Sequence, residues 1–144
     1  MMLEELNLSK SDSLLEIGSG CGYHAAVASR LVSKVTTIER IPYIYELACE
    51  NLDNYDNIEI INGDGSRGFM DNCPYQKIMV TCGAPRVPPP LIDQLAVGGL
   101  MVIPVGDRVA QELLTVERTA DGISVFRRPG VAFVPMIGVN GFDN

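Results

Sequence analysis

Three glycines within five residues stand near the start of the chain, directly after a short apolar segment. Leu14 to Ile17 leads into Gly18-Ser19-Gly20-Cys21-Gly22, and an alanine-rich stretch typical of a helix follows. Glycines at this density let a backbone bend sharply and let a ligand come close, because any Cβ would block that approach. The pattern predicts a strand, a ligand-binding turn and a helix, but the turn by itself does not identify the ligand.

Two carboxylates follow this turn at positions that suit a nucleoside. Glu39 lies 21 residues after Gly18, and an acidic side chain at that distance can accept hydrogen bonds from two ribose hydroxyls. Asp64 lies between Gly63 and Gly65, where it can accept from an adenine amino group while Gly65 lets the ring lie against the backbone. A strand-end charge is the alternative for Glu39, and a plain turn is the alternative for Asp64. Their order after successive predicted strands favours the nucleoside site.

The residue after the glycine turn helps to choose between nucleoside ligands. A dinucleotide site has the spacing G-x-G-x-x-G, but the third glycine position here holds Tyr23, and nothing basic near the turn offers to bind a pyrophosphate. S-adenosylmethionine has no phosphate, and its carboxylate can use a helix N-terminus. Glu16 could face its ammonium group; the alternative is a strand-end carboxylate bonded to backbone. The turn therefore favours S-adenosylmethionine over NAD.

The elements that must position these residues alternate between strand and helix, and then become strands alone. Strands are predicted at Leu14–Ile17, Val35–Ile38, Ile58–Ile61, Lys77–Thr81 and Leu100–Val105, with helices at Leu3–Leu8, Tyr23–Leu31, Tyr43–Leu52 and Pro90–Leu95. Strands at Gln111–Thr119, Ile123–Arg128 and Val131–Val134 follow, separated by Asp-Gly and Pro-Gly turns. This order predicts an α/β fold: one domain over residues 1–144, with a doubly wound, mostly parallel, Rossmann-like sheet and antiparallel C-terminal strands. Because the carboxyl ends of parallel strands lie at the same edge of the sheet, we expect the glycine turn, Glu39 and Asp64 to lie close together.

The amino-acid composition limits which partners, cellular location and metal sites can be expected. The chain has 144 residues, 47% of them hydrophobic and 20% charged, with a net charge of −7. The acidic balance disfavours a nucleic-acid partner, and no apolar run approaches the roughly 18 residues of a membrane span. The acidic N-terminus lacks a signal-peptide pattern, so a cytoplasmic location is expected. Four cysteines without a C-x-x-C pair predict reduced thiols and no metal site, and the oligomeric state is not predicted.

Several segments together resemble one enzyme family. They are Leu15–Ala26, Ile38–Pro42, Gly63–Gly65, Val80–Pro85, Gly98–Gly106 and Phe133–Gly138. With these segments the chain is similar to protein-L-isoaspartate O-methyltransferase, a class I family that depends on S-adenosylmethionine. The resemblance implies methyl transfer to the abnormal carboxylate of isoaspartyl residues in damaged proteins or peptides, which starts their repair, with S-adenosylhomocysteine as the product.

The resemblance also implies which residues act. The cofactor site would consist of Glu16, Gly18, Ser19, Gly20, Gly22, Glu39, Arg40, Asp64 and Gly65. No catalytic residue is assigned, because a carboxylate is already anionic at pH 7 and needs no general base to attack a sulfonium methyl. Alignment and desolvation can supply most of the catalysis. The single histidine, His24, is expected to pack on a helix face and not to act as a base.

One part of the family pattern has no counterpart. Members carry a longer N-terminal region with a Thr-Ile-Ser-type segment whose hydroxyl contacts the active site, but here only Met1 to Leu8 precedes the first polar turn. An N-terminally truncated methyltransferase is therefore expected, and the alternatives are a cofactor-binding core with little turnover or a methyltransferase for a small molecule or nucleic acid. Amino-methylating nucleic-acid enzymes usually carry Asn/Asp-Pro-Pro-aromatic after the fourth strand, where this chain has Thr81–Pro85.

Overall fold

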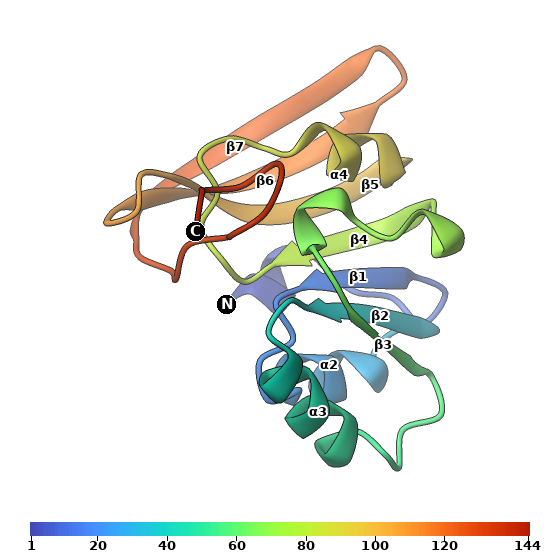
Figure 1. Ribbon diagram of the computed structural model, residues 1–144. Coiled ribbons are helices and arrows are strands. Elements are labelled where there is room, and N and C mark those ends of the chain that lie inside the picture. The colour runs from blue at the N-terminus through green and yellow to red at the C-terminus, as the bar shows by residue number, and fades with distance from the viewer.

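The computed structural model describes residues 1–144 and contains one seven-stranded sheet in the order β3-β2-β1-β4-β5-β6-β7 (Figure 1). The strands are β1 Ser13–Ile17, β2 Lys34–Glu39, β3 Ile58–Asn62, β4 Tyr75–Val80, β5 Leu95–Gly106, β6 Gln111–Thr119 and β7 Gly122–Val131. The helices are α1 Met2–Glu5, α2 Tyr23–Ser29, α3 Pro42–Asn51 and α4 Pro89–Gln94, with 3-10 segments η1 Gly65–Arg67 and η2 Met70–Asn72. None of the helices has the length and apolar character that crossing a bilayer requires.

The sheet has a parallel part and an antiparallel edge, which confirms the predicted fold class. Strands β3, β2, β1, β4 and β5 pair in parallel, whereas β5 pairs with β6 and β6 with β7 in antiparallel fashion. The strand order reverses at β1, because the next strand lies on one side of it and β4 on the other. Open α/β sheets bind ligands at this kind of switch point, outside the carboxyl ends of the strands.

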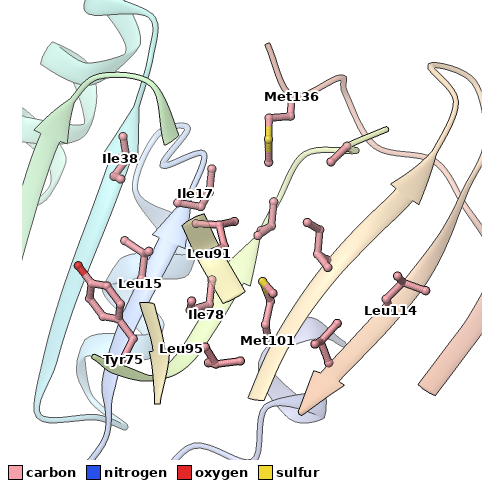
Figure 2. Packing of buried hydrophobic residues seen from close by; sticks show 14 residues of the cluster. Leu15, Ile17, Ile38, Tyr75, Ile78, Leu91, Leu95, Met101, Leu114 and Met136 are labelled. Atoms are coloured by element: carbon pink, nitrogen blue, oxygen red, sulfur yellow. The ribbon is translucent and has the colours of Figure 1, made fainter. Parts of the chain in front are cut away.

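Each face of the sheet carries its own hydrophobic cluster. Leu15 and Ile17 of β1 point to the face covered by α4, and Figure 2 shows them in one cluster with Leu91 of that helix. Leu14 points to the opposite face, where it packs with residues of α1, α2 and α3. Because side chains alternate along a strand, Glu16 must also point to this second face, beneath the helix that follows the glycine turn. The helices thus cover both faces and leave the strand ends open for a site.

The C-terminal part of the chain differs from the prediction in two places. Residues Pro129-Gly130 do not form a turn but lie inside β7, at a register shift opposite β6, and the predicted strand Val131–Val134 is absent because β7 ends at Val131. Proline is tolerated there because Pro129 lies at the register shift of an edge strand and has no paired residue on β6, so its missing N–H removes no ladder bond. The predicted turn at Gly98-Gly99 likewise lies within β5.

Candidate active site

A cavity of about 460 Å³ opens at the carboxyl ends of the parallel strands. Its lining combines the turn after β1, the end of β2, Gly65 after β3 and Thr81 and Cys82 after β4. Of the residues predicted for the cofactor site, Gly18, Ser19, Gly20, Glu39, Arg40 and Gly65 line it, whereas Glu16, Gly22 and Asp64 do not. The cavity has the size typical of a small-molecule site.

The glycine turn is held against the two neighbouring strands by hydrogen bonds from a backbone amide and from a threonine hydroxyl. The N–H of Gly18 donates to the Ile38 carbonyl at 2.9 Å, and the Thr81 hydroxyl donates to the carbonyl oxygens of Ile17 and Gly18 at 2.9 and 2.8 Å. Gly18 has φ +93°, a conformation that side chains rarely adopt, and a Cβ there would lie 2.5 Å from the Thr81 hydroxyl. The turn therefore requires glycine both for its conformation and for its close approach to β4.

Replacing Gly18 by alanine should weaken both the fold and ligand binding. The left-handed φ and the contact with Thr81 together should destabilise the protein by about 2–4 kcal/mol, and the displaced turn should bind its ligand less tightly. Urea unfolding and calorimetric titration with S-adenosylhomocysteine measure the two effects. Gly98→Ala is the matched control: its φ is +83° but nothing lies within 4 Å of the added Cβ. The control should lose stability and keep its affinity, so equal affinity losses in both variants would contradict this role of the turn.

Glu39 at the end of β2 connects the glycine turn to the start of α3. Its carboxylate accepts from the Gly20 N–H at 3.0 Å and from the Ile41 N–H at 3.1 Å, and only 8% of the residue is exposed. A carboxylate has about four acceptor positions, so these two bonds leave positions on each oxygen for a ligand. Glu39 therefore stabilises the glycine turn through Gly20, and it remains available to accept hydrogen bonds from hydroxyl groups in the cavity.

Glu16 lies beneath the turn and does not reach the cavity. It is fully buried, and its Oε1 accepts from the Thr37 hydroxyl at 2.5 Å, which in turn lies 2.6 Å from the Ser19 hydroxyl. Its Oε2 has no partner. Burial raises the pKa of Glu16 to about 8, and the nearby Glu39 charge adds to the rise against the opposing hydrogen bond from Thr37. The predicted direct contact between Glu16 and an ammonium group is therefore replaced by a hydrogen-bonded chain that ends at Ser19.

Asp64 and Gly22 have structural partners that the sequence did not indicate. Asp64 accepts from the Ser66 N–H and hydroxyl at 3.0 and 2.7 Å, and from the Val139 N–H at 2.9 Å. Burial disfavours its charge, but these hydrogen bonds and the nearby Arg67 outweigh burial and lower the pKa of Asp64. Gly22 precedes α2 with φ +96°, and a Cβ there would lie 2.9 Å from the Leu52 side chain. Both residues shape the cavity from outside its lining.

The structure adds lining residues that sequence reasoning missed. Val134, Pro135, Met136 and Ile137, all from the irregular chain after β7, form one wall. Cys82 also lines the cavity, and burial together with the Glu39 charge raises the pKa of its thiol to about 12. The thiol therefore stays neutral at pH 7, which keeps it from competing as a nucleophile. His24 lies exposed on α2 at the cavity, where its ring contacts the Tyr23 ring edge-on at a centroid distance of 5.6 Å.

The chemistry of the lining indicates a particular type of ligand. Glu39 is the single carboxylate in it, and Arg40 and His24 are its only basic residues. Such a lining suits a nucleoside without a phosphate group, held by hydroxyl-to-carboxylate hydrogen bonds and apolar contacts from Ile38, Ile41 and similar side chains. It contains no carboxylate pair for acid–base catalysis, so it suits a reaction governed by alignment of the reactants.

Comparisons with known proteins agree on one family. The family model described as Protein-L-isoaspartate(D-aspartate) O-methyltransferase matches residues 1–141. A protein-L-isoaspartate O-methyltransferase of Methanothermobacter thermautotrophicus is 48% identical over 149 residues, which cover 99% of this chain and 69% of that relative. One of Methanopyrus kandleri is also 48% identical, over 99% of this chain and 66% of its own length.

Solved structures show the same fold. A protein-L-isoaspartate O-methyltransferase structure superposes with a TM-score of 0.91 at 29% identity, over 97% of this chain and 46% of that chain. A Plasmodium falciparum structure, described as a member of the same class in complex with S-adenosyl-L-homocysteine, has a TM-score of 0.75 at 22% identity over 94% of this chain and 69% of its own. The second likeness supports the fold alone.

Proposed function

Since the chain belongs to the protein-L-isoaspartate(D-aspartate) O-methyltransferase family and is an S-adenosylmethionine-dependent methyltransferase of that kind, we propose that it methylates isoaspartyl residues of damaged proteins. The chain spans 66–69% of the length of these curated relatives, so its own turnover is part of the proposal. The observation that carries the proposal is the cavity at the strand ends, with Glu39 as its one carboxylate. Its volume and its lack of a basic cluster fit S-adenosylmethionine better than a dinucleotide.

The residues of this cavity would hold the cofactor in a defined order. Glu39 would accept from the ribose hydroxyls, beside Arg40, and the backbone of Gly18 to Gly20 would meet the amino-acid end near the start of α2. Gly65 lines the adenine end. Ser66 donates two bonds to Asp64 Oδ1 and Val139 donates one to Oδ2, so the adenine amino group would take the acceptor position left on Oδ2. Asp64, Glu16 and Gly22 lie outside the lining and would help to position it. Glu16 would act through its hydrogen-bonded chain to Thr37 and Ser19, and Gly22 through the start of α2. Asp64 would position the lining in addition to its adenine contact.

The protein's part in the reaction is to align and to desolvate. S-adenosylmethionine supplies an electrophilic methyl group on a sulfonium, and an isoaspartyl carboxylate is the acceptor. That carboxylate is anionic at pH 7, so no residue has to remove a proton. Met136 and Ile137 on one wall and the neutral Cys82 on another provide an apolar surface that excludes water from the reacting atoms.

An assay with matched peptides tests the proposed substrate. A peptide with one isoaspartyl residue should accept the methyl group as a base-labile ester, and the same peptide with ordinary aspartate should react about 100-fold less efficiently in kcat/KM. Cofactor binding is measured in parallel by calorimetry. Transfer to RNA or to a small carboxylic acid in preference to the isoaspartyl peptide would overturn the assignment.

A cofactor-binding core with little turnover is the second candidate. The chain spans 66–69% of the length of these relatives, so cofactor binding and methyl transfer are tested separately. S-adenosylmethionine binding without transfer to the isoaspartyl peptide would establish it.

We also propose a cytoplasmic location and no nucleic-acid partner. The four free cysteines suit a reducing compartment, and the net charge of −7 disfavours binding to a phosphate backbone.

A further inference from the structure

One wall of the cavity is a segment without regular structure. Residues 132–143, here called the C-terminal strap, follow β7 and return across the ends of the central strands (red in Figure 1). The Gly83 N–H donates to the Val134 carbonyl at 2.8 Å, and the Met136 N–H donates to the Gly83 carbonyl at 2.7 Å. These bonds fix the strap beside β4. The Met136 side chain, only 3% exposed, joins the hydrophobic cluster on the α4 face (Figure 2).

Beyond Met136 the strap folds back on itself, and the tip of this turn docks on the segment after β3. The Val139 N–H donates to Asp64 Oδ2 at 2.9 Å, and the Asn140 N–H donates to Ser66 Oγ at 3.0 Å. The Ser66 hydroxyl in turn donates to Asp64 Oδ1 at 2.7 Å, and Ser66 is fully buried. Asp64 and Ser66 therefore form one polar anchor that receives two consecutive strap amides.

A glycine makes this docking possible. An added Cβ at Gly138 would lie 2.1 Å from Asp64 Oδ1 and 2.8 Å from Ser66 Oγ, so no side chain fits between strap and anchor. The φ of Gly138 lies outside the left-handed region, so alanine could adopt its backbone conformation. Glycine is therefore required at this position because a side chain would collide with the anchor, and not because of the backbone conformation. Gly138 itself does not line the cavity, so a methyl group added there would not touch a ligand directly.

We propose that Asp64 and Ser66 are positioning residues that hold the C-terminal strap as the outer wall of the cofactor cavity, so that they control cofactor retention from outside its lining. The proposal rests on the proposed function in one respect, namely that the cavity binds S-adenosylmethionine. A wall made by an irregular segment must be ordered for binding, and ordering it on each binding event lowers affinity. The anchor orders the strap in advance, so its loss should mainly raise the dissociation rate of the cofactor.

Two alanine variants that each add one methyl group test this role. Gly138→Ala separates strap and anchor, whereas Gly63→Ala adds the same group next to Asp64 with nothing within 4 Å. Hydrogen exchange by mass spectrometry reports on the peptide 134–142, and stopped-flow and calorimetric titrations with S-adenosylhomocysteine give its dissociation rate and affinity. Gly138→Ala should speed exchange in the strap, raise the dissociation rate about tenfold and leave the urea midpoint nearly unchanged, and Gly63→Ala should match the wild type.

Each other result overturns the proposal. Faster exchange in the strap of Gly138→Ala with an unchanged dissociation rate would mean that the strap does not retain the cofactor. Unchanged exchange would mean that Asp64 and Ser66 do not hold the strap. If the urea midpoint and the cofactor affinity of Gly138→Ala fall together, the contact between strap and anchor stabilises the whole fold and has no specific role in cofactor retention. Failure of the proposed function is recognised separately, because then the folded wild-type chain itself binds no S-adenosylhomocysteine.

Discussion

Replacing Glu39 by alanine should lower the affinity for S-adenosylmethionine and S-adenosylhomocysteine by about 100-fold or more. The change removes the single carboxylate of the cavity lining and, with it, two charge-assisted bonds to ribose hydroxyls. Each such bond contributes about 1.5–3 kcal/mol, so their joint loss corresponds to roughly 10²–10⁴ in Kd. The Gly20 and Ile41 N–H groups also lose their acceptor, which loosens the turn on the same side of the cavity.

Calorimetric titration with S-adenosylhomocysteine measures this loss, and an exposed carboxylate supplies the control. Glu46 lies exposed on α3, the helix that follows Glu39, so Glu46→Ala makes the same change in net charge away from the lining. The affinity of Glu46→Ala for S-adenosylhomocysteine should stay within about twofold of the wild type, because an exposed charge outside the lining is screened by salt. If Glu39→Ala binds as tightly as Glu46→Ala, the ribose contact does not involve Glu39.

The part of the site that the sequence predicted depends on a general property of parallel sheets. Gly18, Glu39 and Gly65 are far apart in the chain, yet all three line one cavity because each lies at or just after the carboxyl end of a neighbouring strand. The glycine spacing and the distance to Glu39 are local patterns, and the fold brings them together without further information. For the same reason the parallel order and the antiparallel edge could be predicted from the alternation of strands and helices.

The part that the sequence did not predict depends on contacts between segments remote in the chain. Asp64-Gly65 matches both an adenine contact and an ordinary turn, and nothing local indicates that Val139, 75 residues later, donates to its carboxylate. The first residues of the strap were predicted as part of a strand, and beyond Val134 the strap has neither helical nor strand periodicity, so its place as a cavity wall could not be anticipated. Pro129-Gly130 was predicted as a turn because local turn chemistry cannot distinguish it from a bulge on an edge strand.

The pH dependence of stability should reveal the buried carboxyl group of Glu16. Its pKa is about 8 in the folded protein and about 4.5 in the unfolded chain, so between these values the folded state holds a proton that the unfolded state has released. This contribution to stability is complete below the unfolded pKa and is lost as the pH rises through the folded pKa. The free energy of unfolding should therefore fall by up to about 1.4 kcal/mol per pH unit between pH 5 and 8.

Glu16→Gln should remove most of this slope. Glutamine keeps an oxygen acceptor for the Thr37 hydroxyl but does not titrate, and its buried amide lacks a partner as Oε2 does now. The variant should thus be less stable than the wild type at pH 5 and more stable at pH 9, with the curves crossing between. Urea unfolding from pH 5 to 9 measures both curves.

Glu59→Gln provides the comparison for this last experiment. Glu59 on β3 is hydrogen-bonded by Asn72 and Lys34, and these contacts lower its pKa, so its own contribution is lost only as the pH falls toward its folded pKa. Its removal should leave the slope between pH 5 and 8 unchanged. Parallel curves for Glu16→Gln and the wild type would mean that Glu16 is charged in the folded protein. The turn above it would then rest on a buried anion and not on a neutral hydrogen-bonded acid.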